Sequence, residues 1–158
     1  MIRCGIGYDV HRLSKGRKLI LGGVEIAHSL GLEGHSDADV LSHAIADALL
    51  GAIAVGDIGQ HFPNTDESIR GMSSIDILRQ VAALLAKNKA RPINVDATLI
   101  AEAPKIAPHI PAMRKTIAQA VALDESRVGI KATTNEGLGA IGRSEGIAAM
   151  AIATVEQE

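Results

Sequence analysis

The stretch from Gly34 to Asp47 constrains this chain more than any other part of its sequence. It reads GHSDADVLSHAIAD, a polar turn that leads into an apolar run typical of a buried helix. We predict that Ser36 caps this helix and that Asp39 is its capping-box acid. A helix that starts there would offer free backbone N–H groups and the positive end of its dipole, which together favour a bound phosphate.

The same helix carries a polar face within its apolar sequence. Asp39, His43 and Asp47 recur every four residues, so they share one side of a helix. A histidine between carboxylates is either a hydrogen-bonded core histidine or a metal ligand that an acid orients. On the helix alone, the core histidine is the favoured interpretation.

The start of the chain changes that balance towards a metal. Residues 2–13, IRCGIGYDVHRL, predict a strand, and on a strand Asp9 and His11 point to the same face. Together with His43 they supply one carboxylate and two imidazoles. Three protein ligands with one open position are how catalytic zinc is usually held. We therefore predict a metal site at these three residues.

Composition limits what kind of protein this is. The 158 residues suit one domain, residues 1–158, and 47 % of them are apolar with no Trp, one Phe and one Tyr, so the core must be aliphatic. A formal charge of −2 argues against a nucleic-acid surface. The single Cys4 fits a reducing compartment, and neither a membrane span nor a signal peptide is visible. We expect a cytoplasmic protein with no membrane or nucleic-acid partner.

The remaining sequence alternates between strand and helix patterns. We predict an α+β fold, a single mixed β-sheet with helices packed on one face. The last strand is apolar at nearly every position, so we expect a second subunit to cover its other face. The predicted elements are a strand with a Gly-Gly turn (18–26), a helix ending at Leu50 before Gly51, an irregular segment (55–71), helices at 74–89 and 108–123, and strands at 93–102, 127–133 and 146–157.

Several polar residues of the loops allow more than one function from the sequence alone. Asp57 could contact substrate hydroxyls or form an Asx turn, and Lys105 could bind a phosphate or simply be solvated. His61 has no spacing partner and is interpreted as a loop histidine. The segment 133–146, TTNEGLGAIGRSEG, could wrap a diphosphate while Glu136 holds a divalent cation, but a glycine-rich hairpin connection is equally consistent with it.

Several motifs together resemble one enzyme family, 2-C-methyl-D-erythritol 2,4-cyclodiphosphate synthase. The resemblance spans the whole chain in order, and the combination of DVH with GHSDADVLSHAIAD is its most specific part. The motifs are YDVH (8–11), GHSDAD (34–39), HAIAD (43–47), GDIG (56–59), FP (62–63), APK (103–105) and the segment from Ala132 to Gly146.

The resemblance implies a reaction and two metals. The substrate would be 4-diphosphocytidyl-2-C-methyl-D-erythritol 2-phosphate, and the products would be the cyclic diphosphate and CMP in the non-mevalonate isoprenoid pathway. Asp9, His11 and His43 would bind Zn²⁺, with Asp47 as the acid behind them. Glu136 would hold Mg²⁺ or Mn²⁺.

It also implies which residues bind the substrate, and how the chain assembles. His35 and Thr134 would act in catalysis, and three subunits would surround a threefold axis with each active site between neighbours. An axial cavity could hold a prenyl diphosphate on Arg143. The implied substrate-binding residues are Asp9, His11, His35, Ser36, Asp57, Ile58, Gly59, Phe62, Asp66, Ala101, Ala103, Pro104, Lys105, Ile106, Ala107, Thr133, Thr134, Glu136 and Arg143.

The chain departs from the family pattern at three positions. Asn64 stands where many relatives carry an acid, Ala140 stands where some carry Phe near the axis, and Met150 replaces an acid nearby. Two other functions compete with the synthase. One is a zinc-dependent phosphohydrolase that uses the same ligands, and the other is a non-catalytic trimer that binds prenyl phosphates.

Overall fold

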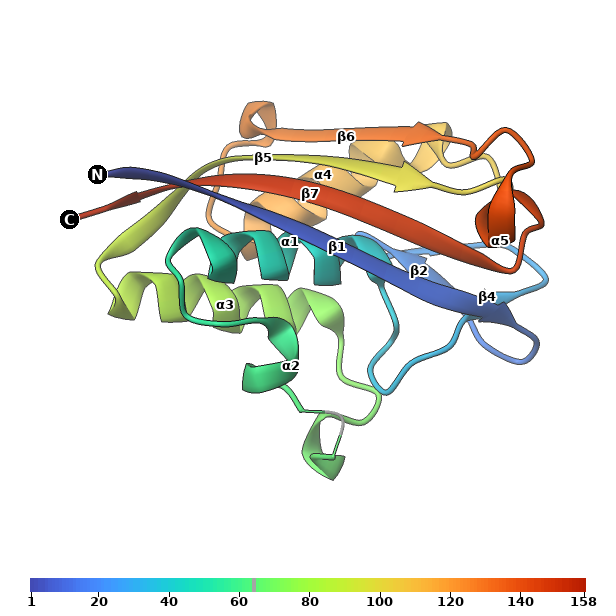
Figure 1. Cartoon of the computed structure of the whole chain (residues 1–158), viewed down its shortest axis with the longest axis horizontal. Helices are drawn as coiled ribbons and strands as arrows, with labels where there is room; N and C mark the ends of the chain where they lie inside the picture. Colours follow the sequence, from blue (N-terminus) through green and yellow to red (C-terminus); the bar gives the residue numbers. More distant parts are fainter. Residues whose placement is uncertain (64) are drawn as a thin grey trace.

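Two long antiparallel strands form the spine of a mixed sheet in the computed structural model, which describes residues 1–63 and 65–158 (Figure 1). They are β1 (Ile2–Ser14) and β7 (Gly146–Gln157), paired from Ile2 opposite Glu156 to Arg12 opposite Gly146. The sheet order is β4-β1-β7-β5-β6, and only β5 and β6 run parallel. The other strands are β4 (Gly31–Leu32), β5 (Ala90–Ile100) and β6 (Val128–Thr133). The predicted mixed sheet is confirmed, but it is not the single sheet that we predicted, because the strands within residues 19–26 pair separately.

A separate hairpin lies beside the main sheet. Strands β2 (Leu19–Leu21) and β3 (Val24–Ile26) pair antiparallel, and Gly22 and Gly23 join them. Both glycines have positive φ, 57° and 73°, as a two-residue hairpin turn requires. The predicted Gly-Gly turn is therefore confirmed, although its strands form a second, two-stranded sheet.

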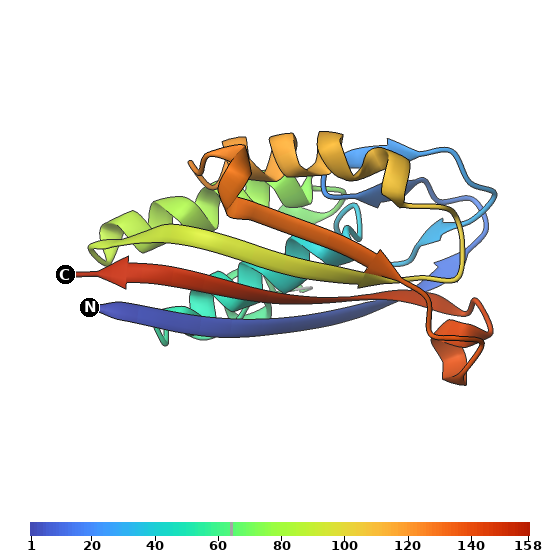
Figure 2. The same cartoon turned by 90° about the horizontal axis from the view of Figure 1, so that it is seen from above.

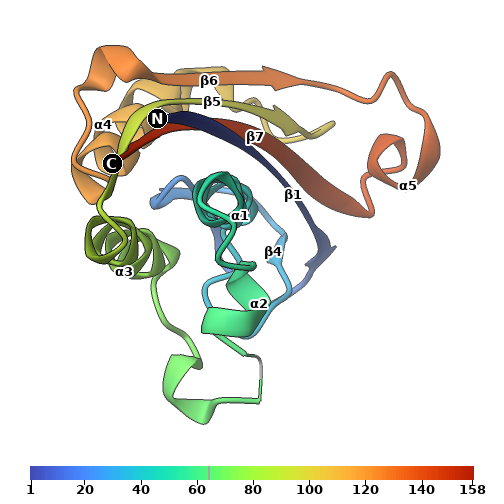
Figure 3. The same cartoon turned by 60° about the vertical axis from the view of Figure 1, so that its left-hand side comes forward.

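The three longest helices lie on one side of the main sheet, as predicted (Figures 2 and 3). Helix α1 packs directly under β1 and β7, and α3 packs against α1. These helices are α1 (Val40–Ala52), α3 (Ser74–Lys87) and α4 (Ile110–Ala120). Short elements occupy the connections, including the segment predicted to be irregular: α2 (Ile58–His61), α5 (Gly139–Gly142), and 3₁₀ turns at Glu67–Ile69, Ala107–His109 and Glu125–Arg127.

The predicted ends of α1 are wrong. The N-cap is Asp39 instead of Ser36, and the helix passes through Gly51 to end at Ala52. Asp39 is fully buried, and its carboxylate accepts the Ser42 N–H of the first turn as well as the N–H groups of Gly22 and Gly23 at 2.8 and 2.7 Å. These tertiary donors decide the cap. The Asp39 carboxyl therefore occupies an N–H group of the first turn, and burial raises its pKa. A phosphate site in that turn stays a prediction.

The two faces of the sheet differ in polarity and cover. The inner face meets an aliphatic core in which α1 is almost wholly buried. On the outer face, Ile6, Tyr8 and Ile152 are 66, 56 and 51 % exposed. The second cover predicted for β7 is therefore not provided by this chain itself. Within the described residues, none of the helices is long and apolar enough to cross a membrane.

Candidate active site

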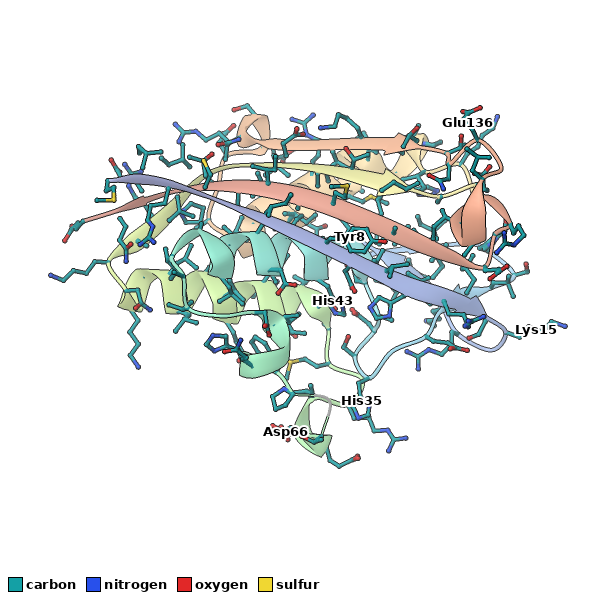
Figure 4. The ribbon with its side chains drawn as sticks, viewed as in Figure 1. Tyr8, Lys15, His35, His43, Asp66 and Glu136 are labelled. Atoms are coloured by element: carbon teal, nitrogen blue, oxygen red, sulfur yellow. The ribbon has the colours of Figure 1, made fainter. Side chains whose placement is uncertain are left out.

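Three potential metal ligands converge between β1 and α1. Asp9 and His11 lie on the inward face of β1, and their ligand atoms meet that of His43 from α1. Figure 4 shows where His43 lies. Asp9 Oδ2 lies 2.9 Å from His11 Nε2 and 3.0 Å from His43 Nδ1, and the two ring nitrogens are 3.2 Å apart. The spacing expected from the sequence is thus realised as one compact cluster.

Glycines on β1 make this convergence possible. Gly5 and Gly7 lie on the same strand face as the ligands, and α1 packs against them. A Cβ atom at Gly7 would lie 1.9 Å from the Ala44 carbonyl oxygen, and one at Gly5 would lie 2.0 Å from that of Ala48. Only glycine lets the helix backbone come this close to the strand.

The donor atoms fit a tetrahedral zinc ion. Ligands about 2.0 Å from zinc at tetrahedral angles lie about 3.3 Å apart, close to the observed separations. His11 Nδ1 lies 2.5 Å from the Glu33 carbonyl oxygen, which can only accept, so the lone pair of the neutral His11 ring is on Nε2 and faces the cluster. When His11 is protonated, Nε2 instead donates to the Asp9 carboxylate, and a bound cation would take the place of that proton.

The electrostatics of the cluster agree with this fit. Burial alone would raise the pKa of Asp9, but hydrogen bonds and charge from His11 and His43 hold it well below its usual range. Burial likewise opposes protonation of His11, yet Asp9 raises the pKa of that imidazole above its ordinary value. The carboxylate is therefore ready to bind a cation at neutral pH.

A cavity of about 190 Å³ opens beside the cluster. Its other walls come from the loop before α1, from α2 with Phe62 directly after it, and from Ile69 and Ile77. Of the predicted substrate-binding residues, the cavity brings together Asp9, His11, His35, Ser36, Ile58, Gly59 and Phe62. Asn64 lies outside the described residues. The cavity thus places apolar and polar groups around one open side of the ligand set.

Two predicted substrate residues serve as helix caps instead of cavity walls. The Asp57 carboxylate accepts the Gln60 N–H at 2.9 Å and caps α2, and Asp66 caps the 3₁₀ turn at Glu67–Ile69 through the Ser68 N–H. Side-chain and backbone hydrogen bonds, from Gln60 to Asp57 and from Ser68 to Asp66, lower the pKa of both carboxyls. Asp57 thus makes a local cap, and its contact with substrate hydroxyls stays a prediction. His61, which binds the Val55 carbonyl, is outside the metal cluster as expected.

Asp47 lines the same cavity, but its carboxylate bonds to the backbone of α2 instead of to His43. Its carboxylate accepts the Ile58 N–H at 2.7 Å, and burial raises its pKa. Among the described residues, no hydrogen bond joins it to His43. The shared helix face of Asp39, His43 and Asp47 therefore serves three separate contacts, and the role of Asp47 behind the metal stays a prediction.

A second cavity of about 320 Å³ lies towards the opposite edge of the sheet, where β5 and β6 end. It contains the residues predicted for the cytidine diphosphate: Ala101, Pro104, Lys105, Ile106, Ala107 and Thr134. Ala103 and Thr133 belong to the same segments but do not line it.

Glu136 accepts the Thr134 hydroxyl at 3.0 Å and is exposed, far from His43 (Figure 4). The two cavities share no residue, so one chain holds two separate halves of the predicted site. Arg143 is paired with Glu145 at 2.7 Å on an exposed surface.

Three polar residues of these sites were missed in the sequence. Ser74 and Asp37 contact each other beside His43, and Glu102 accepts the N–H groups of Asn135 and Gly137 and so orders the Glu136 loop. Ser74 lies at the start of the helix predicted from residue 74. No spacing in the sequence connects it to a histidine 31 positions earlier.

This α+β fold, with its cluster of two histidines and an aspartate beside a cavity, is the structure of the YgbB family, whose model matches residues 2–156. The chain is 60 % identical over 156 residues to a 2-C-methyl-D-erythritol 2,4-cyclodiphosphate synthase from Alkaliphilus metalliredigens, covering 99 % of this chain and 98 % of the relative. It is 56 % identical over 156 residues to the enzyme of the same name from Syntrophomonas wolfei, covering 99 % of each.

Solved structures agree with the sequence relatives. The bifunctional IspDF of Campylobacter jejuni matches with a TM-score of 0.96 at 40 % identity; all of this chain is covered, but it spans only 43 % of that protein. The IspF of Plasmodium falciparum, described as a CDP complex, matches with a TM-score of 0.86 at 34 % identity over 99 % of this chain and 97 % of that one. The chain therefore belongs to the 2-C-methyl-D-erythritol 2,4-cyclodiphosphate synthase family.

Proposed function

We propose that this chain cyclises 4-diphosphocytidyl-2-C-methyl-D-erythritol 2-phosphate to the 2,4-cyclodiphosphate and releases CMP. The observation that carries the proposal is the convergence of Asp9, His11 and His43 at a cavity that His35 and Ser36 also line. A metal-type cluster beside polar side chains suits a substrate that carries several phosphates.

The reaction needs no nucleophile from the protein. An oxygen of the 2-phosphate attacks the β-phosphorus of the same molecule, and a new P–O bond forms. The bond from the β-phosphorus to its bridging oxygen breaks, and that electron pair leaves with CMP. Asp9, His11 and His43 would hold Zn²⁺ and Glu136 would hold Mg²⁺ or Mn²⁺, and these ions would supply positive charge that offsets phosphate repulsion and polarises the phosphorus.

The chain's own task is to fold the substrate so that its two ends meet. His35 and Ser36 hold the methylerythritol phosphate, and Ile58, Gly59 and Phe62 enclose the erythritol carbons. This positioning replaces a bimolecular encounter by an intramolecular one, an effect that reaches about 7–11 kcal/mol in the best-oriented cases. The cavity beside the metal cluster supports this assignment, since it contains all five residues.

The nucleotide half requires a neighbouring subunit. Residues 101–107 and Thr134 form the second cavity, which suits the cytidine diphosphate, with Lys105 near its phosphates. Because the two cavities share no residue, a homotrimer with active sites between subunits would join them. The exposed apolar outer face of β1 and β7 supports this assembly. A prenyl diphosphate on Arg143 would need the axial cavity of the same trimer.

Phosphorus NMR tests the proposal. The purified protein with zinc, Mg²⁺ and the substrate is expected to give two coupled resonances of a cyclic diphosphate, together with CMP. Inorganic phosphate would instead establish the phosphohydrolase. An unchanged spectrum, with bound zinc verified, would establish the non-catalytic phosphate-binding trimer. Sedimentation of the same sample tests the trimer separately.

A further inference from the structure

Helix α3 supplies a hydrogen-bond partner for the proposed metal ligand His43, beside Ser36, whose Oγ lies 3.1 Å from His43 Nε2 and also accepts the Ala38 N–H. Ser74, its first residue, is fully buried, and its Oγ lies 2.9 Å from His43 Nε2. The opposite ring nitrogen, Nδ1, is the one that faces Asp9 and His11. Ser74 therefore contacts the ring on the side away from the ligand cluster.

Asp37 fixes the direction of this contact. Its carboxylate accepts the Ser74 hydroxyl and, at 2.9 Å, the Ser74 backbone N–H. A serine hydroxyl has one hydrogen, and Ser74 donates it in the hydrogen bond to the Asp37 carboxylate. The oxygen of Ser74 can then only accept from His43, so the proton of the imidazole is on Nε2 and the lone pair is on Nδ1.

This arrangement opposes a competing one inside the cluster. Asp9 Oδ2 is 3.0 Å from His43 Nδ1 and would readily accept a proton from that atom. A proton on Nδ1 would occupy the direction in which a metal must bind. Ser74, held by Asp37, gives the Nε2 proton a buried acceptor and so favours the tautomer that leaves Nδ1 free. His11 is fixed in the same sense by the Glu33 carbonyl.

We infer that Asp37 and Ser74 are positioning residues that hold His43 in its metal-binding tautomer and ring orientation. The inference rests on the proposed metal site at Asp9, His11 and His43. Hydrogen-bond partners of metal-bound histidines commonly change metal affinity 10- to 100-fold when they are removed. The contacts of Asp37 also link the loop before α1 to the start of α3, since the Asp37 N–H donates to the Met72 carbonyl at 3.1 Å.

Two neighbouring serines allow a matched test. Ser74→Ala removes the hydroxyl that Asp37 orients at His43 Nε2 and leaves only Ser36 Oγ, 3.1 Å from that nitrogen. Ser73→Ala removes only the N-cap of α3, whose oxygen accepts the Ile75 N–H at 3.3 Å. Zinc affinity is measured for each whole protein by competition with a chelator. We expect about a 10- to 100-fold loss for Ser74→Ala and wild-type affinity for Ser73→Ala, even where the latter melts lower. Ser74→Thr, which keeps the hydroxyl, should restore most of the affinity.

A second measurement needs no variant. ¹⁵N NMR of the metal-free wild type in mildly alkaline solution should show the His43 proton on Nε2. A proton on Nδ1, or equal zinc affinity in folded Ser74→Ala and wild type, would overturn the inference. The proposed function fails differently: there the wild type itself would bind no zinc, or His43→Ala would bind it as well as wild type.

Discussion

Replacing Gly7 by alanine should damage the metal site through backbone packing alone. The new Cβ would lie 1.9 Å from the Ala44 carbonyl oxygen, whereas a carbon–oxygen contact needs about 3.3 Å. Strand and helix must therefore separate by about 1.4 Å. Ala44 follows His43, and Gly7 lies two residues before Asp9 on the same strand face, so this shift falls directly on the ligands.

The size of the effect follows from this overlap. Metal–ligand distances tolerate about 0.2 Å, several times less than the shift, so we expect zinc affinity to fall at least tenfold, or about 1.4 kcal/mol. Overpacking typically costs about 1–3 kcal/mol of stability, and α1 has little room to move because it also packs against β7 and α3. Without the clash, Gly→Ala would stabilise by about 0.4–1 kcal/mol, so the sign of the change is itself informative.

Gly51 provides the control on the same helix. An alanine Cβ there would lie 3.9 Å from its nearest neighbour, the Ile6 carbonyl oxygen, and the position is exposed within α1. Gly51→Ala should raise the free energy of unfolding by about 0.5–1 kcal/mol and leave zinc affinity unchanged. Urea unfolding and chelator competition measure both quantities. Wild-type stability and zinc affinity in Gly7→Ala would refute the close-packing argument.

The remaining predictions concern single side chains and pH. His43→Ala should lose zinc and activity but keep the oligomer, as metal analysis and sedimentation would show, and retained zinc would contradict its role as ligand. Glu136→Gln should keep zinc but lose the dependence of turnover on Mg²⁺ or Mn²⁺; an unchanged metal titration would remove Glu136 from that role. Ile6→Glu, which places a charge on a residue 66 % exposed in the single chain, should break the trimer and activity while sparing zinc binding. Because Asp9 raises the pKa of His11, protons should displace zinc as the pH falls through that raised value, and affinity should be constant above it; calorimetry that shows no such fall would contradict the ligand assignment.

Patterns within one element could be predicted from the sequence. The alternation of β1 placed Asp9 and His11 on one face because a strand repeats every two residues, whatever lies around it. The apolar run after Asp39 likewise predicted a buried helix from the residues of one element alone. The mixed sheet and its helices on one face followed from the order of these elements.

Contacts between distant elements could not be predicted in this way. The cap of α1 depends on Gly22 and Gly23, which donate to Asp39 only after the hairpin has folded back. The partner of His43 is Ser74, on a helix that looked purely structural. A local pattern gives the type of a residue and its side of an element, but tertiary hydrogen bonds decide which acceptor or donor it meets.

The two faces of β1 link metal binding to assembly. Its inward residues are the glycines and ligands, from Gly5 to His11, and its outward residues are Ile6, Tyr8 and Val10, which are all exposed in the single chain. A shift of one residue in the pairing with β7 would turn the ligands out and the apolar residues in. The register that forms the metal site is therefore the register that presents the apolar outer face. In the proposed trimer the nucleotide cavity comes from a neighbour, so a chain with the correct metal geometry would also present the surface on which that trimer forms.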